Sequence, residues 1–427
     1  MKLELNIIRI NDILFTNKTS VEDGVLSIDR IELSKILEAD TRLKDFNIEL
    51  TKPGEKCRII RVVDVIEPRA KIVKGGQEYP GGPDQQGTVG RGSTLVLRGV
   101  AVVISENRSP GDPGRASTGI IDMWGEGARM GPYGKTCNVV VMARPAGGIT
   151  PDEYHLALKI AGLKTAAYLA RAGTGVETDG IEAYDLPPVT EPPEDYSKLP
   201  VVTYIFQVLT NQYEPIAGDP VLYGDNIKEI VPTILHPNEV LDGAITTPYS
   251  SAFMETYMIQ NHPVILELYR QHNRSLCFRG VIISTAPNNA PEYERTATVA
   301  ANLAKWTLGA DGAVLTKCGG GAPELVMART AQKCEQMGIK TAMALIHMGL
   351  DTTEISMKAS TIFSDVPELD AMISMGTPAG NPLLELEPAD RIIGTTDGSE
   401  QGGKTLLRLV RGAISQLGDS RLIAVRY

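Results

Sequence analysis

The feature that most constrains the fold is an alternation of short apolar runs and longer helical patterns that begins near residue 278. Continuous apolar runs are typical of strands buried on both faces, and their alternation with helices indicates parallel βαβ units. The runs are FRGVIIST (278–285), DGAVLTK (311–317) and IKTAMALIHM (339–348), and the helical patterns are 290–310 and 322–338. The sequence therefore predicts a parallel, Rossmann-like α/β domain. Segments 367–377 and 389–396 predict further strands, and 404–417 predicts a last amphipathic helix.

The first half of the chain has a different pattern. Segments 57–73 and 93–105 are β-branched and apolar, and Gly/Pro clusters separate them, which predicts a β-rich half. One helix is expected after Ile149, because Thr150, Pro151 and Glu153 form a capping box with proline in the first turn. Gly173 is expected to end it.

Four regions follow from these patterns. We expect a β-rich region over 1–182 and a connecting loop over 183–200, which contains five prolines. Residues 201–245 and 246–427 complete the division; the family resemblance given below implies that the former end an alpha-subunit-like part and that the latter form a beta-subunit-like α/β domain. We find no internal repeat.

Composition narrows the functional class. The net charge of -10 argues against a nucleic-acid or anionic-membrane partner. No apolar run is long enough for a membrane-spanning helix, and the first residues do not resemble a signal peptide, so we expect a cytoplasmic protein. The five scattered cysteines are expected to be reduced thiols, and neither cysteines nor histidines have the spacing of a metal site.

A glycine-rich turn joins the strand at 311–317 to the following helix. Cys318 precedes Gly319, Gly320 and Gly321, and glycines let backbone N–H groups approach an anion near a helix N-terminus. The turn is thus a candidate ligand site for a carboxylate or phosphate, or it is a tight crossover without ligand. Cys318 is a candidate nucleophile, with packing as the alternative.

Several ordered blocks of sequence resemble the glycine/sarcosine/betaine reductase component B proprotein, and more distantly the D-proline reductase proprotein. The blocks are VVDVIEPRAKI (62–72), VGRGSTLVLRGVAVV (89–103), GIIDMWGEGA (119–128), 155–173, 221–245, NHPVILELYRQH (261–272) and 292–317. They follow one another through nearly the whole chain.

The resemblance implies a specific chemistry. Members of this family cut themselves at an Asn-Cys step after a D-G-A-I segment, and the cysteine becomes a pyruvoyl group. The two resulting subunits work with a selenocysteine-containing subunit. The pyruvoyl carbonyl captures a substrate amine as a Schiff base, and a selenolate attacks the neighbouring carbon as the C–N bond breaks.

This chain departs from the family at that step. After the 242–245 segment it reads TTPYSSAFME, without asparagine or cysteine, and Tyr249-Ser250 takes the place of Asn-Cys. Ser250 and Ser251 are candidate pyruvoyl precursors, because a serine hydroxyl can attack the preceding carbonyl, and His262 or Glu255 would be the base. The altered sequence favours an intact chain, in which the hydroxyls form an ordinary turn.

Two further features allow more than one interpretation. His262 is either a ligand-binding residue or a surface or core histidine. Arg61, Asp64, Glu67 and Arg69 are charged residues in one predicted strand, either on an exposed face or, through Arg69, in a subunit contact or a carboxylate clamp.

We therefore predict a subunit of a reductase-like complex that cleaves the C–N bond of a small amine or betaine-type substrate. A separate selenoprotein or thiol subunit would supply the nucleophile, and an oligomer is expected. The alternative is an uncleaved paralogue without pyruvoyl that acts as a ligand-binding or assembly subunit. A third possibility is a thiol enzyme that uses Cys318.

Overall fold

A computed structural model gives the fold of the chain. It describes residues 1–72, 79–82, 89–107, 112, 118–191, 199–208, 222–224, 231–247, 254–287, 289–317, 322–345, 371–374, 383–394 and 402–418. Among these residues no helix combines the length and the apolar character needed to cross a membrane.

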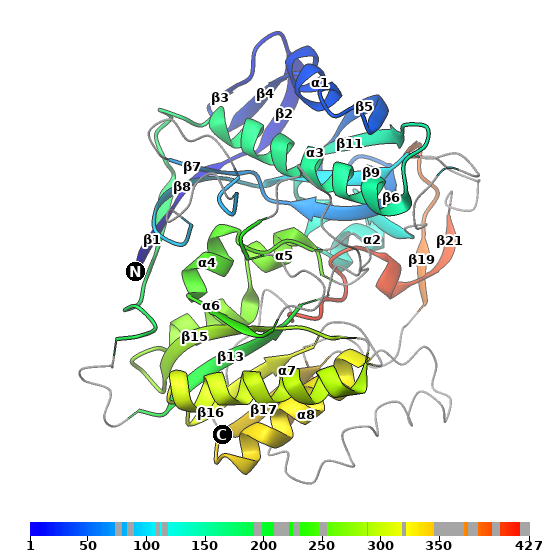
Figure 1. Cartoon of the computed structure of the whole chain (residues 1–427). Helices are drawn as coiled ribbons and strands as arrows, with labels where there is room; N and C mark the ends of the chain where they lie inside the picture. Colours follow the sequence, from blue (N-terminus) through cyan, green and yellow to red (C-terminus); the bar gives the residue numbers. More distant parts are fainter. Residues whose placement is uncertain are drawn as a thin grey trace.

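Two mixed sheets dominate the first half of the chain (Figure 1). The first has the order β12 (Gly180–Asp185), β1 (Lys2–Arg9), β8 (Gly92–Arg98), β7 (Arg69–Lys71). The second has the order β10 (Gly119–Asp122), β6 (Cys57–Ile66), β9 (Val100–Glu106), β11 (Cys137–Pro145), β5 (Leu43–Thr51), and β20 (Arg391–Ile393) pairs with β6. A small sheet of β2 (Asp12–Thr16), β4 (Val25–Asp29) and β3 (Ser20–Glu22) lies beside helix α1 (Arg30–Glu38).

Helix α3 (Pro151–Arg171) confirms the capping-box prediction. Thr150 Oγ1 accepts a hydrogen bond from Glu153 N, and the Glu153 carboxylate accepts one from Thr150 N. The helix packs across β7 and β9 and contributes Tyr154 and Leu158 to the largest hydrophobic core. Most of its residues are buried, so it fixes the two N-terminal sheets to each other.

The third sheet has the order β14 (Thr233–Leu235), β15 (Cys277–Ser284), β13 (Val201–Gln207), β16 (Gly312–Thr316), β17 (Lys340–Leu345), β18 (Ala371–Ser374). All pairs are parallel except β14 with β15. Counted along the chain, the parallel strands follow the 2-1-3-4-5 order of a doubly wound sheet. The prediction of an α/β fold with parallel strands is thus confirmed at the level of fold class.

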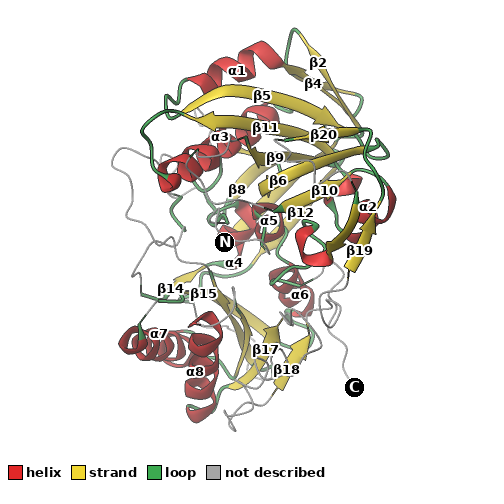
Figure 2. Cartoon of the chain, turned by 90° about the vertical axis from the view of Figure 1, so that its right-hand side faces the viewer, coloured by secondary structure: helices red, strands yellow, loops and turns green. Residues whose placement is uncertain are grey.

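Helices cover both faces of this sheet. α7 (Ala290–Asn302), continued by a π-helical turn (Leu303–Thr307), packs with α8 (Ala322–Gln336) on one face. The short helices α4 (Pro237–Asp242), α5 (Thr256–Gln260) and α6 (Pro263–Gln271) lie between the sheet and the N-terminal half (Figure 2). The region around α4–α6 is therefore the layer that joins the two halves.

The central strand of the third sheet comes from the chain before residue 246. β13 pairs with β15 on one side and with β16 on the other, and both partners follow α6 in the sequence. The sheet thus uses strands from the 201–245 and 246–427 regions together. The division of the chain into subunit-like regions stays a prediction.

The amphipathic helix predicted over 404–417 is wrong. The segment forms β21 (Gly403–Leu406), which pairs with β19 (Leu383–Leu386), and then a single 3-10 turn (Leu407–Leu409). Gly412 has φ +75°, which a helix does not allow, and Arg411 N donates a hydrogen bond to Ile120 O. Pairing with the N-terminal half therefore overrides the local pattern.

Buried charges fasten α4 to the first sheet. The Asp242 carboxylate, at the last residue of α4, accepts hydrogen bonds from Thr94 Oγ1 (2.6 Å) and Gly90 N (2.7 Å) and pairs with the Lys71 ammonium. Lys71 and Asp242 are both almost completely excluded from solvent. A buried pair of this kind costs desolvation but is strongly destabilising when only one partner is removed.

We expect Lys71→Met to lower the free energy of unfolding by about 3–5 kcal/mol, because it leaves the Asp242 carboxylate buried without its cation. Urea unfolding measures the change. The matched control is Arg129→Met, which removes an exposed pair with Glu126 and should cost less than about 1 kcal/mol. Equal stability of the two variants would contradict the role of the buried pair.

Candidate functional site

Most residues that the sequence analysis singled out lie outside the described residues. They are Ser250, Ser251, Cys318, Gly319, Gly320 and Gly321. The predictions made for them stay predictions. His262 and Glu255 are described, and both are buried.

Asp64 joins the two described ends of the segment that contains Ser250. Thr247 precedes this segment, and Thr256 follows it at the start of α5. Asp64 Oδ1 accepts a hydrogen bond from Thr256 N (2.9 Å), and its Oδ2 accepts one from Thr256 Oγ1 (2.7 Å). Thr256 Oγ1 in turn accepts one from Thr247 N (3.1 Å). Strand β6 thus holds both ends at one carboxyl group.

Glu255 is a second buried carboxyl group beside Thr256. It accepts a hydrogen bond from the Tyr133 hydroxyl (3.1 Å) at Oε2, and Arg411 Nη1 lies 3.6 Å from its Oε1. The Arg411 Nε and Nη2 groups also donate to Val62 O on β6. Three segments far apart in the sequence therefore meet at Glu255.

Burial changes the acidity of both carboxyl groups. Loss of solvent raises the pKa of Asp64 to about 7, against the hydrogen bonds from Thr256, and the nearby charge of Glu255 adds to the increase. Burial also raises the pKa of Glu255, although Arg411 opposes this change. A carboxyl group with a pKa of about 7, as at Asp64, can hold and release a proton near neutral pH, which general acid–base chemistry requires.

His262 is a core residue on the other side of α5. Its Nε2 lies 3.1 Å from the Tyr204 hydroxyl, which lies 2.5 Å from Thr316 Oγ1 at the end of β16. Its ring stands edge-on against Tyr204 and Phe206. Burial lowers the pKa of His262 to about 3, so the imidazole is neutral at physiological pH. The Nδ1 atom is buried and has no hydrogen-bond partner in the part of the chain that the structure describes.

The interpretation of Asp64, Glu67 and Arg69 as residues on an exposed strand face is wrong. Asp64, Glu67 and Arg69 are completely buried. Arg69 donates to Glu67 Oε2 and to Leu241 O, and Glu67 N donates to Gln260 Oε1 (2.9 Å). Packing of β6 and β7 against α4 and α5 buries these charges, and Arg69 thereby joins the two halves of the chain.

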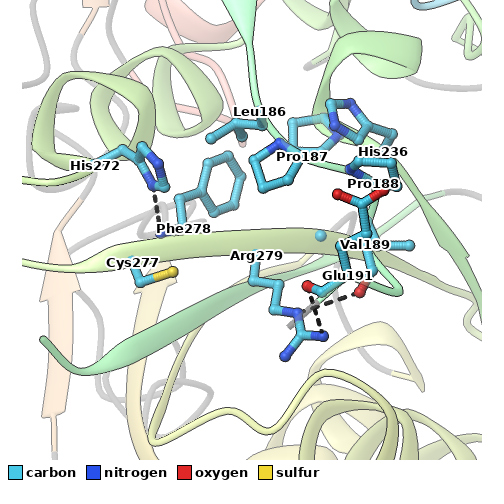
Figure 3. Close-up of a pocket in the computed structure, with 12 residues that line it drawn as sticks. Leu186, Pro187, Pro188, Val189, Glu191, His236, His272, Cys277, Phe278 and Arg279 are labelled. Carbon is cyan, nitrogen blue, oxygen red and sulfur yellow. Dashed lines mark hydrogen bonds between the residues drawn. The ribbon is translucent and has the colours of Figure 1, made fainter. Parts of the chain in front are cut away.

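A small pocket lies between the 186–191 segment and β15 (Figure 3). His272 Nδ1 accepts a hydrogen bond from Phe278 N (3.0 Å), and Arg279 donates to Val189 O (3.2 Å). The pocket has a volume of about 10 Å³, which holds roughly one water molecule. It is too small for a substrate.

The described cysteines are Cys57, Cys137, Cys277 and Cys334, and all four are free and buried. Burial raises the pKa of each thiol, to about 11 for Cys137 and about 12 for Cys334. These values oppose formation of a nucleophilic thiolate. In the described ranges no cluster of His, Cys, Asp and Glu is arranged to hold a metal ion.

Sequence reasoning missed Tyr133, Tyr204, Thr316 and Arg411. Each is isolated from the others in the sequence, and no short motif marks any of them. Tyr204 and Thr316 come together through the parallel pairing of β13 with β16, which is a long-range contact.

The fold and the buried polar groups define a class. An open parallel sheet with polar residues at the ends of its central strands is typical of α/β proteins that bind small molecules. The chain belongs to the family described as glycine/sarcosine/betaine reductase component B subunits, whose model matches residues 1–407.

Curated relatives resemble the chain along its length. It is 33% identical to the glycine reductase complex component B subunits alpha and beta of Acetoanaerobium sticklandii, over the whole of both chains. It is 34% identical to the sarcosine reductase complex component B subunit alpha of Peptoclostridium acidaminophilum, over 98% of this chain and 94% of the relative. The betaine reductase complex component B subunit alpha of that organism is 33% identical, over 94% of this chain and 90% of the relative. No solved structure matches the chain.

We expect Asp64→Asn to change how stability depends on pH. The folded carboxyl group keeps its proton up to about pH 7, whereas the unfolded group loses it near 3.8. Between these values the folded state binds more protons, so the free energy of unfolding of the parent protein falls as pH rises. The amide has no such dependence. The stability of the variant relative to the parent should therefore increase by at most about 1.4 kcal/mol per pH unit.

Urea unfolding at several pH values across this window measures the difference. Glu126→Gln, at an exposed site, is the control and should give a profile parallel to the parent. If the free energy of unfolding of Asp64→Asn also ran parallel to that of the parent across this pH window, Asp64 would be ionised in the folded protein throughout the window.

Proposed function

We propose that the chain is a subunit of a glycine/sarcosine/betaine-reductase-like complex that cleaves the C–N bond of a small amine or betaine-type substrate. The match to component B subunits over residues 1–407 carries this proposal, because it includes both halves of the chain and the layer between them. The relatives' names place those proteins in glycine, sarcosine and betaine reductase complexes. A cytoplasmic location and an oligomeric state stay predictions.

In this proposal a pyruvoyl group would derive from Ser250 or Ser251. Such a group supplies an electrophilic carbonyl to which a substrate amine can add. Addition of an amine to a carbonyl requires proton transfers, and burial raises the pKa values of Glu255 and of Asp64, which accepts a hydrogen bond from Thr256 N. Their burial also limits the access of water.

The nucleophile would come from a separate selenoprotein or thiol subunit. The chain contains no selenocysteine, and its described thiols are buried with raised pKa values. Reductive cleavage of a C–N bond consumes two electrons, which the partner's selenolate or thiolate would provide as it attacks carbon. The leaving amine takes up a proton, and a buried carboxylic acid is a suitable donor.

The third sheet would keep two fragments together after cleavage near Ser250. The central strand β13 lies before that site, whereas its neighbours β15 and β16 lie after it. Separation would break both parallel ladders and expose the core around Tyr204 and Phe206. We therefore expect the fragments to separate only under denaturing conditions.

A second function has its own support in the sequence. Because TTPYSSAFME lacks the Asn-Cys step, the chain can also be an uncleaved paralogue that binds a ligand or assembles the complex. The contacts of Thr256 with Asp64 and with Thr247 do not require a break in the chain.

Mass spectrometry of the purified full-length protein tests the first function. The first function requires two fragments under denaturing conditions, ending and beginning near Ser250, of which the smaller reacts with phenylhydrazine or borohydride. Under native conditions both should remain in one species. Ser250→Ala and Ser251→Ala identify the precursor, because only one of them should abolish cleavage; Ser275→Ala, at an exposed serine, is the control.

A single intact mass without carbonyl reactivity would remove the pyruvoyl mechanism. The second function then predicts co-purification with a partner subunit and no reductive cleavage of glycine, sarcosine or betaine. Unchanged activity of Cys318→Ala would exclude the thiol mechanism.

A further inference from the structure

The third sheet has a topological switch point between β13 and β16. From β13 the chain continues through α4–α6 to β15, and from β16 it continues through α8 to β17 on the other side. The first connection runs on the face toward the N-terminal half and α8 lies on the other face, so no single crossover helix follows both β13 and β16 (Figure 1). In open α/β sheets, ligands bind in the crevice at such a point, outside the carboxyl ends of the strands.

Buried polar residues collect at these carboxyl ends, although the strands themselves are largely apolar. They are Gln207 at the end of β13, Ser284 and Thr285 at the end of β15, and Thr316 and Lys317 at the end of β16. A polar group in a sheet interior costs free energy unless it is hydrogen-bonded. Polar residues at three adjacent strand ends therefore indicate a shared polar site.

Two sets of side chains flank the switch point, one on each face of the sheet. On the α5 side, Tyr204 reaches from the middle of β13 toward its end and contacts both His262 and Thr316. On the α8 side, Lys317 forms an ion pair with Glu324, and Gln207 Nε2 donates to Pro323 O (3.0 Å). Neighbouring residues of a strand point to opposite faces. Thr316 therefore belongs to the set on the α5 side, and Lys317 belongs to the set on the α8 side.

The Nδ1 atom of His262 has no hydrogen-bond partner among the described residues. The side chain is completely buried, and a buried nitrogen without a hydrogen bond costs about 1–3 kcal/mol. The Nε2 atom is already occupied by Tyr204. A ligand group, or a water bound to the ligand, can form a hydrogen bond with Nδ1.

We infer that the carboxyl ends of β13 and β16 form a binding site for a small carboxylate-bearing amine. The Lys317 ammonium would attract its carboxylate, and Tyr204 and His262 would hydrogen-bond its polar groups from the opposite face. The choice of ligand class rests on the proposed function, whereas the location of the site rests on the strand order and the buried polar residues alone.

Ligand binding to the full-length protein tests this inference. Isothermal titration with glycine, sarcosine and betaine gives the affinities, and acetate and methylamine serve as half-ligands. We expect the carboxylate-bearing compounds, including acetate, to bind and methylamine not to bind. Tyr204→Phe, Thr316→Val and His262→Gln should each weaken binding about tenfold, because each removes one hydrogen-bonding group.

Matched controls separate the site from general effects of the same substitutions. They are Tyr154→Phe, Thr330→Val and His236→Gln, at buried positions outside the switch point, and they should leave the affinity unchanged. Affinities that fall equally in site and control variants would overturn the inference.

A measurement on the unmodified protein avoids variants that fail to fold. Hydrogen exchange with and without saturating ligand should slow in peptides that contain 201–208 and 312–317. Absence of binding by all five compounds, or protection confined to other peptides, would overturn the inference. Fragment masses are read separately, so an intact chain that binds at this site refutes the pyruvoyl mechanism and leaves the site in place.

Discussion

The position of β13 at the centre of the third sheet is the constraint on which the rest of the structure depends. Its two parallel ladders join the chain before α4 to the chain after α6. The intervening helices must therefore return across one face of the sheet, where they meet the N-terminal half. This return places His262 against Tyr204 and places Thr256 against Asp64.

Buried charges determine where the layer of α4–α6 rests on the N-terminal sheets. Asp242 pairs with Lys71, and Arg69 donates to carbonyl groups of Leu241 and Gln260. Ion pairs of this kind add little stability relative to apolar packing, but they tolerate only one arrangement because any shift leaves a charge unpaired. These contacts of β7 hold α4 and α5, which flank the segment that contains Ser250, against the first sheet.

Local patterns in the sequence predicted the elements of the fold well. The capping box of α3 and the alternation from β15 to β17 involve neighbouring residues, and the structure contains both. The failures have a common physical cause in long-range contacts. Pairing of Arg411 with Ile120 replaces the expected last helix, and packing by α4 and α5 buries the charges near Arg69. The site residues Tyr133, Tyr204 and Thr316 were missed because only the folded chain brings them to Glu255 and His262.

The scaffold around Asp64 is compatible with an intact and with a cleaved chain. Its hydrogen bonds use the backbone and hydroxyl of Thr256 and, through them, the backbone of Thr247. None of these atoms belongs to residues 248–253, so breaking a peptide bond there leaves the contacts in place. The contacts of Asp64 and Thr256 therefore do not involve the side chains of residues 249 and 250. A fold can be kept while the chemistry of one segment differs, because function depends on the residues of the site.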